Sequence, residues 1–387
     1  MSPAASLRSV AALSVRGRRV FVRADLNVPM RDGAIVDDAR IRASLETLNW
    51  LREQGARVVL ASHLGRPRGV RSAELSLEPI ASALELPLAP DCIGAATVAR
   101  VAEMRDGDAL LLENLRFHAG EEANDPEFVE ALAELADVYV NDAFGTAHRA
   151  HASTEGLAKR LPERGAGFLM KREVDTLGEL RDRPKRPYVC VLGGAKVSDK
   201  LAVMEALAAR ADLLCVGGAM AYTFLLARGE PVGLSLVEPD LVETARRLLD
   251  GPTEILLPSD HVVAPGRDAA SAATTVDVIP EDQMALDIGP RSIAALAERI
   301  DSARTVFWNG PLGLFETPPF DAGSCAIAAC CAKSAAFTVV GGGDSLAAVR
   351  GAGVADQISH LSTGGGASLE FLEGRKLPGI HALEGDA

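Results

Sequence analysis

The stretch LMKREVDTLGELRDR (169–183), which runs into RPKRP (183–187), decides the fold of this 387-residue chain. Its apolar residues recur at the spacing of an amphipathic helix, and two prolines then stop the pattern. A chain of this length is too long for one hydrophobic core of ordinary size. We therefore expect a helix over residues 169–184 that connects two domains.

Short apolar runs alternate with helical patterns on both sides of this helix, and we expect each run to be a strand. They are RVFVRAD (19–25), RVVLASH (57–63), LLLENLRF (110–117), DVYVNDAF (137–144), YVCVLGG (188–194), LLCVGG (213–218), EILLPSD (254–260), TVFWNGP (305–311) and FTVVGGG (337–343). Strands of continuous hydrophobicity between helices are typical of parallel sheets that are covered on both faces. The sequence thus predicts an α/β fold with two doubly wound, Rossmann-like domains.

Composition and charge narrow the class of protein. With 48% hydrophobic and 24% charged residues, the chain is typical of a soluble globular protein. Its apolar runs are too short to span a membrane, and we expect no signal peptide, because MSPAASLRSVAALSVRGRR (1–19) lacks a sustained apolar segment. The six cysteines lack C-x-x-C spacing, which favours reduced thiols and a cytoplasmic location. A net charge of −13 argues against binding to nucleic acid or to membranes.

Arginines gather near the ends of the predicted strands in the first half. Of the 24 basic residues in positions 1–184, 22 are arginine, a side chain suited to bidentate contacts with phosphate and carboxylate. Because ligands of open α/β sheets bind at the carboxyl ends of strands, four of these arginines indicate a ligand with several negative groups. They are Arg40, Arg66, Arg116 and Arg149.

Other polar residues accompany these arginines. Asp25 and Asn27, two residues apart, are expected on one face and favour a hydroxyl-bearing ligand. His63 ends the second predicted strand. Taken singly, each residue has a simpler explanation: Arg40 lies near Asp37 and Asp38, Arg116 near Glu113, and an individual histidine is more often structural than functional.

Glycines follow the predicted strands of the second half, where they would allow backbone amides to approach phosphate. GGGDS (341–345) precedes a predicted helix; Asp344 would suit a phosphate-bound cation, and Ser345 a helix cap or a phosphate contact. Alone, this motif is equally consistent with a simple helix cap. Lys196 and Lys200, four apart and so expected on one helical face, would supply positive charge, and the carboxylate of Glu316 would accept from ribose hydroxyls. A nicotinamide dehydrogenase is disfavoured, because the G-x-G-x-x-G spacing is absent.

Eight motifs, in this order, resemble those of the phosphoglycerate kinase family over residues 18–380. They are RADLNVP (23–29), SHLGRP (62–67), LLENLRF (111–117), NDAFGTAHRAH (141–151), GGAKVSDK (193–200), WNGPLGLFE (308–316), GGGDS (341–345) and STGGGAS (362–368). The resemblance implies a 3-phosphoglycerate-binding domain at 1–168 and a nucleotide-binding domain at 185–363, with a cleft between them. It also implies that a tail, 364–387, returns to the first domain, and that the protein is a cytoplasmic monomer.

The resemblance also assigns roles to individual residues. The substrate contacts that it implies are Asp25, Leu26, Asn27, Arg40, His63, Leu64, Gly65, Arg66, Arg116 and Arg149. The nucleotide contacts are Lys200, Gly217, Gly218, Asn309, Pro311, Glu316, Gly341, Gly342, Gly343, Asp344 and Ser345, with Asp344 also holding Mg²⁺. Arg40, Lys196 and Gly365, in the glycine run 364–366, would act on the transferring group. Ala285 and Leu234 depart from the family pattern, where glycine and a polar residue are commoner.

The implied reaction is reversible phosphoryl transfer between 1,3-bisphosphoglycerate and ADP. Both attacking groups, a carboxylate and a diphosphate, are already anionic, so we expect no general base, and His63 is interpreted as a ligand rather than a catalyst. The reaction needs charge neutralisation, in-line positioning and exclusion of water, which domain closure would provide. Two alternatives stay open: a nucleotide-binding scaffold without transfer activity, and a kinase for another carboxylate.

Overall fold

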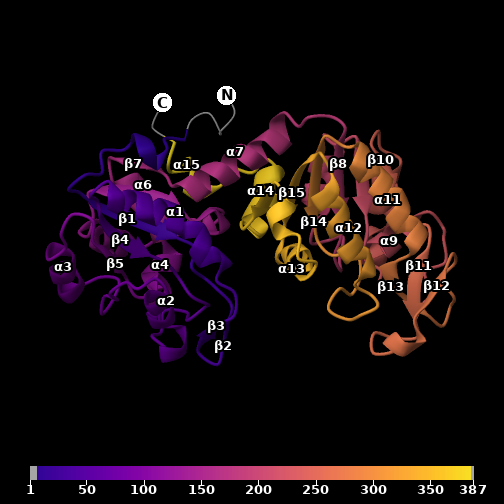
Figure 1. Cartoon of the computed structure of the whole chain (residues 1–387), viewed down its shortest axis with the longest axis horizontal. Helices are drawn as coiled ribbons and strands as arrows, with labels where there is room; N and C mark the ends of the chain where they lie inside the picture. Colours follow the sequence, from indigo (N-terminus) through magenta and orange to yellow (C-terminus); the bar gives the residue numbers. More distant parts are fainter. Residues whose placement is uncertain (1–6, 385–387) are drawn as a thin grey trace. The chain divides into compact units, whose positions relative to one another are not determined.

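The computed structural model describes residues 7–384, which form two compact units. Unit 1 comprises Met1–Gly178 and Arg375–Ala387, and unit 2 comprises Glu179–Gly374 (Figure 1). Residues 1–6, which form part of the stretch used to judge a signal peptide, lie outside the described residues, as do residues 385–387 of the expected tail.

Unit 1 is built on a five-stranded sheet in the order β5-β4-β1-β6-β7, and all its strand pairs are parallel. The strands are β1 Arg19–Ala24, β4 Arg57–Ala61, β5 Ala109–Leu111, β6 Val138–Asp142 and β7 Arg164–Ala166, with a separate hairpin of β2 Met30–Arg31 and β3 Ala34–Ile35. The helices are α1 Ala39–Glu53, α2 Glu78–Ala83, α3 Ala95–Ala102, α4 Ala119–Ala123, α5 Pro126–Ala133, α6 Leu157–Arg160 and α15 Pro378–His381.

Both faces of this sheet are buried, which explains why its strands are apolar at consecutive positions. On one face, Val20 and Val22 belong to a buried cluster with Leu48 of α1. On the other face, the rings of Phe21 and Tyr139 stack with centroids 6.2 Å apart. Tyr139 also donates its hydroxyl to the carbonyl of Ser153 at 2.7 Å, so this face is covered by the π-helical turn Ala152–Gly156.

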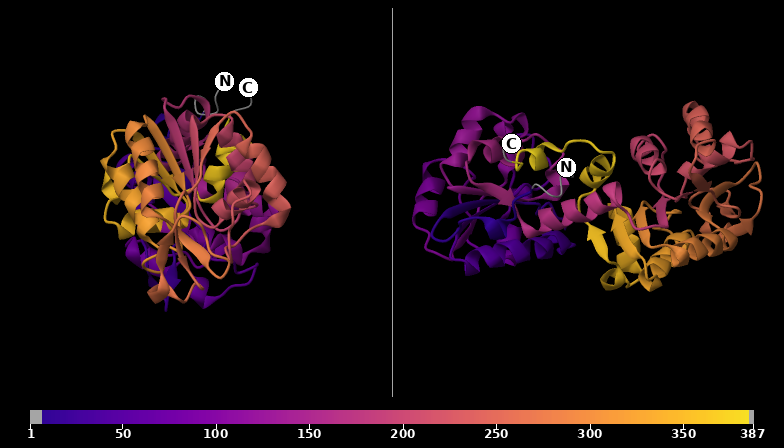
Figure 2. Two further views of the ribbon diagram at one scale, coloured as in Figure 1. Left: turned by 90° about the vertical axis from the view of Figure 1, so that its right-hand side faces the viewer. Right: turned by 90° about the horizontal axis from the view of Figure 1, so that it is seen from above.

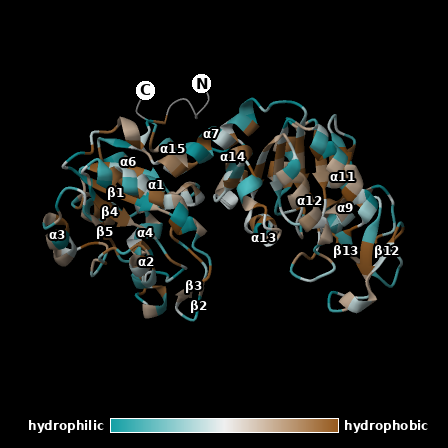
Figure 3. Ribbon diagram, in the orientation of Figure 1, coloured by the Kyte–Doolittle hydropathy of each residue, from teal (hydrophilic) through white to brown (hydrophobic). Residues whose placement is uncertain are grey.

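Unit 2 has a six-stranded parallel sheet in the order β10-β9-β8-β14-β15-β16, and a second, antiparallel sheet in the order β12-β11-β13. The strands are β8 Tyr188–Leu192, β9 Leu213–Val216, β10 Glu254–Leu256, β11 His261–Ala264, β12 Thr274–Val276, β13 Met284–Ile288, β14 Thr305–Asn309, β15 Phe337–Gly341 and β16 His360–Ser362. The helices are α8 Leu201–Ala208, α9 Met220–Ala227, α10 Val242–Leu249, α11 Pro290–Ser302, α12 Ala322–Lys333, α13 Gly343–Gly351 and α14 Gly366–Leu372. Figure 3 shows hydrophobic colours along the central strands.

The connecting helix, α7, spans Phe168–Asp182, and the boundary between the units falls within it, between Gly178 and Glu179. The second crossing lies at Arg375, later than the expected tail start at 364. Residues 364–374 belong to unit 2, where α14 packs against α8 and the Arg181 guanidinium lies 4.6 Å from the ring centroid of Phe371.

The C-terminal segment then lies against unit 1, as the yellow ribbon among its elements shows (Figure 2). The amide of Gly379 donates to the carbonyl of Ala147 at 2.8 Å. A Cβ at position 379 would lie 3.0 Å from the Cα of Ala147. A side chain at position 379 would therefore require the backbone at Ala147 to shift by a few tenths of an ångström.

Three loops of unit 2, which follow β8, β9 and β14, approach one another so closely that glycine is required. A Cβ at Gly193 would overlap the carbonyl oxygen of Pro311. Gly218, at φ +67°, has room for no Cβ either, because that atom would lie 2.6 Å from the amide nitrogen of Gly194. These glycines are thus explained by backbone packing, whereas Gly343 has no atom within 4 Å of a Cβ position.

We expect Gly193→Ala to lower the free energy of unfolding of unit 2 by about 3 kcal/mol or more, because backbone atoms cannot yield as a side chain can. Trp308 is fully buried in unit 2, so its fluorescence in a Trp50→Phe background reports urea unfolding of this unit. Gly351→Ala, at a helical position with open space, is the control and should be neutral or stabilising by up to about 1 kcal/mol. Equal unfolding midpoints for Gly193→Ala and the unmodified chain would refute the packing argument.

Candidate active site

An arginine cluster, consisting of Arg23, Arg40, Arg116 and Arg149, surrounds His63 in unit 1. Burial lowers the pKa of His63 well below its usual value, and the charges of Arg23, Arg116, Arg149 and Arg40 lower it further, in that order. The Arg23 guanidinium donates to Nδ1 of His63 at 3.2 Å. His63 is therefore neutral, with its remaining proton on Nε2, within a region of positive potential.

The residues of the cluster come from different elements of the fold. Arg23 lies in β1 and His63 just after β4. Arg116 lies in a 3-10 turn, Leu115–Phe117, that follows β5, and Arg149 follows the 3-10 turn Phe144–Thr146 after β6. Because the carboxyl ends of parallel strands meet at one edge of the sheet, these sequence-distant residues are close together.

Arg116 is the most deeply enclosed of the predicted site arginines, with 2% of its surface exposed. Nη1 donates to the carbonyl of Gly65 at 2.8 Å, and Nε lies 3.3 Å from Oε1 of Glu122. Nη2 is buried without a hydrogen-bond partner among the described residues. Burial, with the charge of Arg149, lowers the pKa of Arg116 to about 10. A buried cation with an unsatisfied donor is costly unless an anion completes its contacts.

Arg116 does not form an ion pair with the nearby Glu113, because the carboxylate of Glu113 has other partners. Its carboxylate accepts from Ser76 Oγ at 2.7 Å and from the amide of Leu77 at 3.0 Å. Glu113 thus fixes a neighbouring loop and is not the counterion of Arg116.

Arg40 is not simply a solvent-exposed helix residue beside Asp37 and Asp38. Its Nη1 donates to both carboxylate oxygens of Asp25, each at 2.9 Å, and to the carbonyl of Asn27 at 3.1 Å. Asp38 instead pairs with Arg42, one turn along the same helix. Arg40 is therefore directed toward the end of β1 and not toward solvent at the start of α1.

The expectation that Asp25 and Asn27 lie on one face of a strand is wrong, because β1 ends at Ala24. The amide of Asn27 instead donates to Oδ1 of Asp25 at 3.2 Å, which makes a turn. Asn27 Oδ1 accepts from the amide of Gly65 at 2.8 Å. The buried Leu26 and Leu64 lie on the same two loops, so the predicted residues 25–27 and 63–65 are neighbours.

The other predicted residues of unit 1 lie less deeply. Arg149 is half-buried, and its Nε is 3.3 Å from Nε2 of His148. Arg66 is exposed, in the loop that also carries Gly65. His151 is near the cluster: burial lowers its pKa to about 4, with further contributions from Arg116, Arg23 and Arg149.

Sequence reasoning missed Arg23, the fourth arginine of the cluster. It is fully buried, and Nε donates to Ser153 Oγ at 2.8 Å. Ser153 in turn donates to Glu121 at 2.6 Å, and burial raises the pKa of that carboxyl. The available signal was an arginine inside the otherwise apolar run RVFVRAD, since a charge in a buried strand must have a partner.

A cavity of about 200 Å³ lies in unit 2. Four of the predicted residues line it, namely Gly218, Pro311, Glu316 and Asp344, together with the unpredicted Tyr222, Arg267 and Leu314. Ala285, the departure from the family pattern, also lines the cavity and leaves it open. Gly217 lines a separate small apolar cavity beside Leu312. Leu234 is exposed and donates its amide to the carbonyl of Gln283 at 2.8 Å.

The GGGDS loop lies where β15 passes into α13. The strand ends at Gly341, Gly342 has a φ of +91°, and the helix already begins at Gly343. Asp344 is exposed in the first turn, beside the cavity. Ser345 does not cap this helix, because it is fully buried and its Oγ accepts from the amide of Gly310 at 2.5 Å. The loop thus presents glycine backbone and one carboxylate.

The two lysines do not share a helical face, so that prediction is wrong. Helix α8 begins only at Leu201, with Lys200 at its N-cap, and Lys196 lies exposed in the preceding loop. Lys200 instead points inward: Nζ donates to the carbonyl of Gly193 at 2.6 Å and to both oxygens of Asn309, at 2.7 and 2.9 Å. Burial lowers its pKa to about 8, against the charge of Asp344, which raises it.

Together, these features define an α/β protein with an arginine cluster in one unit and a glycine-bordered cavity in the other, an arrangement typical of proteins that bind anionic small molecules. The family model described as Phosphoglycerate kinase matches residues 10–375. A phosphoglycerate kinase of Anaeromyxobacter dehalogenans (strain 2CP-C) is 52% identical over 394 residues, which cover 98% of this chain and 100% of the relative. One of Solibacter usitatus is 52% identical over 391 residues, with the same coverages.

Solved structures agree with these relatives. The phosphoglycerate kinase of Coxiella burnetii matches with a TM-score of 0.88 at 40% identity, and covers 97% of this chain and 98% of its own. That of Pyrococcus horikoshii OT3 matches with a TM-score of 0.85 at 34% identity and the same coverages. The chain belongs to the phosphoglycerate kinase family and is thus a phosphotransferase with a carboxyl acceptor, as the motifs indicated. Within residues 7–384, no helix is long and apolar enough to span a membrane.

Arg149→Met should raise the pKa of both His63 and His151, because a positive charge that disfavours their protonated forms is removed. We expect each midpoint to move up by roughly half a pKa unit to one unit, measured by imidazole NMR titration. His261 of unit 2, whose pKa burial lowers to about 4, is the internal control and should keep its midpoint. Unchanged midpoints for His63 and His151 would contradict the description of Arg149 as part of the cluster.

Proposed function

We propose that the chain carries out its family's reaction with the arginine cluster as the substrate site and the unit 2 cavity as the nucleotide site. The reaction is reversible phosphoryl transfer between 1,3-bisphosphoglycerate and ADP, which gives 3-phosphoglycerate and ATP in glycolysis. The observation that carries this assignment of sites is the buried Arg116, whose Nη2 has no hydrogen-bond partner among the described residues. A phosphate or carboxylate oxygen would satisfy that donor.

The substrate carries a phosphate at one end and a carboxylate or acyl phosphate at the other. Arg116, Arg149 and the exposed Arg66 would bind the phosphate, since guanidinium groups match its geometry. Neutral His63 donates from Nε2 and needs no change of charge to act as a ligand. Asp25 and Asn27 would orient the 2-hydroxyl, and the rest of loops 25–27 and 63–65, including Leu26, Leu64 and Gly65, would close around the substrate.

The nucleotide would lie in the unit 2 cavity. Gly218, Pro311 and the neighbouring Gly217 and Asn309 would border the nucleoside, and Glu316 would accept hydrogen bonds from ribose hydroxyls. The amides of Gly341, Gly342 and Gly343, with Ser345 fixing the loop from beneath, would face the phosphates at the N-terminus of α13. Support comes from the open space at Gly343 and from the four predicted residues that line the cavity.

Lys200 would have to exchange hydrogen-bond partners before it can bind phosphate, because its ammonium group now donates to three protein oxygens. Nucleotide phosphates would compete for Nζ with the carbonyl of Gly193 and the side chain of Asn309. We propose that this exchange couples nucleotide binding to movement of the loop that also carries Lys196.

Asp344 fits Mg²⁺ that arrives with nucleotide phosphates, because such sites use few protein carboxylates. Its carboxylate is exposed at the cavity and contributes to the charge near Lys200. When bound there, Mg²⁺ would neutralise negative charge on the phosphates.

The chemistry itself needs positioning and charge neutralisation more than proton transfer. Arg40, from the end of β1, and the exposed Lys196 would neutralise charge on the transferring group. The amides of residues 364–366 would assist, since a Cβ at Gly365 or Gly366 would meet no atom within 4 Å. Transfer takes place when the two ligand sets come together, and the exclusion of water then protects the acyl phosphate. We further propose that the protein acts in the cytoplasm as a monomer on these small molecules, without nucleic-acid or membrane partners.

A coupled assay with ADP, Mg²⁺ and 1,3-bisphosphoglycerate tests the activity. ATP formation is expected, whereas its absence, with nucleotide binding retained, would favour a scaffold that lacks transfer activity. The same assay with acetyl phosphate compares kcat/KM for 1,3-bisphosphoglycerate with that for another acyl phosphate. A higher kcat/KM with acetyl phosphate would reject the arginine cluster as a phosphoglycerate site.

Arg40→Ala should lower kcat by a factor on the order of 10³ with a modest change in KM, because its charge mainly serves the transition state. Arg42→Ala is the matched control on the same helix, where the side chain pairs with Asp38, and it should keep normal kinetics. Steady-state assays in the ATP-forming direction measure both variants. A kcat close to that of the unmodified chain in Arg40→Ala would reject this role.

Arg66→Ala should chiefly raise the KM for 3-phosphoglycerate in the reverse assay, by roughly tenfold, because one phosphate contact is lost. Arg68→Ala, in the same exposed loop, is the control. If both variants have the same KM, Arg66 is not a substrate contact.

A further inference from the structure

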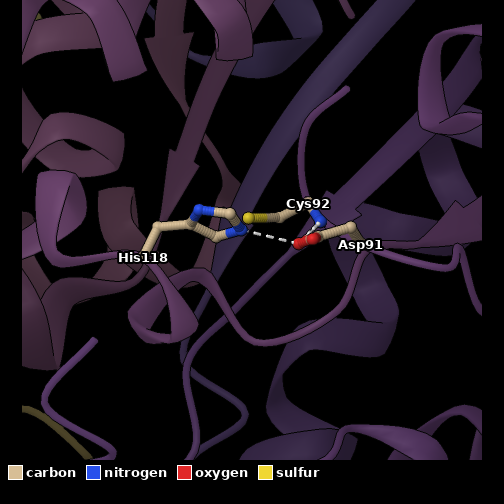
Figure 4. Close-up of side chains that lie close together, drawn as sticks. All are labelled: Asp91, Cys92 and His118. Atoms are coloured by element: carbon tan, nitrogen blue, oxygen red, sulfur yellow. Dashed lines mark hydrogen bonds and ion pairs between the residues drawn. The ribbon is translucent and has the colours of Figure 1, made fainter. Parts of the chain in front are cut away.

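A second group of chemically active side chains lies in unit 1 outside the arginine cluster. Asp91 and Cys92 lie in the loop between α2 and α3, and His118 follows the turn Leu115–Phe117. One ligand atom of each residue lies within 4.8 Å of the others (Figure 4). Among residues 7–384, no other group of three such side chains meets this spacing.

Existing contacts hold the three side chains in place. Oδ1 of Asp91 lies 2.8 Å from Nε2 of His118 and accepts from the amide of Cys92 at 2.7 Å. Oδ2 lies 4.0 Å from Nη1 of Arg71, whose side chain also donates to the carbonyl of Pro90 at 2.8 Å. The His118 ring stacks on Phe128 with centroids 5.4 Å apart. Asp91 thus directs one oxygen toward the group and the other toward Arg71.

A nucleophilic cysteine is a poor explanation of this arrangement. Cys92 is fully buried, and burial, with the charges of Asp91 and Glu121, raises the pKa of its thiol well above the usual value. Reactive cysteines need the opposite shift. In a nucleophile–base relay the acid binds the ring nitrogen remote from the nucleophile. Here Asp91 is bonded to Nε2, and Figure 4 shows the sulfur on that same side of the imidazole.

We propose that Asp91, Cys92 and His118 form a binding site for a thiophilic divalent cation, for which Zn²⁺ is the best chemical match. Sulfur and imidazole nitrogen with one carboxylate oxygen are zinc ligands, whereas Mg²⁺ prefers oxygen alone. Zinc–ligand distances of about 2.0–2.3 Å separate tetrahedral ligand atoms by about 3.3–3.8 Å. The present spacings, from 2.8 Å to at most 4.8 Å, reach that range with side-chain shifts of about 1 Å.

The exchange of protons on binding is balanced without a co-reactant. Cys92 loses its thiol proton to solvent and binds through sulfur. His118 binds through Nε2 as its Nδ1–H tautomer, so the proton that Nε2 donates to Asp91 in the present hydrogen bond passes through solvent to Nδ1, and Asp91 binds through a carboxylate oxygen. The side chains of Asp91 and His118 are 35% and 31% exposed, so water can complete a fourth position. The Arg71 guanidinium would stay outside the shell as the partner of Oδ2.

This site would link two segments of unit 1. His118 lies two residues after Arg116, and Asp91 lies in a loop whose Ala89 amide donates to the carbonyl of Leu111 at the end of β5, at 2.8 Å. A bound cation would therefore fix the segment that carries Arg116. Because it binds only the folded form, it should raise the thermal midpoint of unfolding.

The test uses the full-length chain, stripped of metal by a chelator and free of nucleotide and Mg²⁺. Zn²⁺ is titrated in competition with a chromogenic chelator, and Co²⁺ is added separately as an optical probe. Cys92→Ser and His118→Gln remove ligands. The matched controls are Cys325→Ser and His381→Gln; in the unmodified chain the Cys325 sulfur lies 3.9 Å from Asp321. A third control, Asp344→Asn, removes the proposed magnesium ligand.

We expect one tightly bound Zn²⁺, a thiolate-to-cobalt charge-transfer band and a raised thermal midpoint. Each ligand variant should weaken binding roughly 100-fold or more, and the cobalt band should vanish in Cys92→Ser. The three controls should bind as the unmodified chain does. Absence of the cobalt band in the unmodified chain overturns the proposal even if the variants fail to fold, and so does undiminished binding in folded Cys92→Ser.

Discussion

The structure of unit 1 depends on the burial of like charges around one neutral histidine. Arg23, Arg116, Arg149 and Arg40 all act on His63, and His63 can remain in their midst only because it is uncharged. Arg23 is stabilised by Ser153 and Glu121, and Arg40 by Asp25. Within the part of the chain that the structure describes, the positive potential is only partly compensated, and Nη2 of Arg116 has no hydrogen-bond partner there. In the proposed function, an anionic substrate would supply the remaining negative charge at these arginines.

In unit 2, glycine backbone takes the place that the arginine cluster has in unit 1. Close approach of the loops after β8, β9 and β14 excludes side chains at Gly193 and Gly218, whereas Gly343 is left open. Packing between loops therefore explains the glycines at 193 and 218 but not the glycine at 343, which the proposed nucleotide site would use for access to phosphate. Lys200 also takes part in the packing between these loops, because its ammonium group donates hydrogen bonds to Gly193 and Asn309.

The parallel sheets could be predicted because their strands are continuous apolar runs, which double burial requires. Strands β7 and β16 were missed because they are three residues long and carry few apolar side chains. The antiparallel strands β11, β12 and β13, which follow the run 254–260, were missed as well. Most of the arginine cluster could be expected from the edge at which parallel strands end. Arg23 could have been recognised as a buried charge that needs a partner, but the sequence does not show which partner, because Ser153 is 130 residues away. The positions of Lys196 and Lys200 depended on where α8 begins, and no sequence spacing fixes a helix start to one residue.

The most direct test of the central claim is calorimetric titration of 3-phosphoglycerate into the chain and into Arg116→Met, without nucleotide. One equivalent should bind to the unmodified chain, with an affinity that falls as salt is added, and Arg116→Met should bind at least about tenfold more weakly while remaining folded. Equal affinities for the two proteins would show that the buried guanidinium does not await an anion, and the account of unit 1 would be wrong.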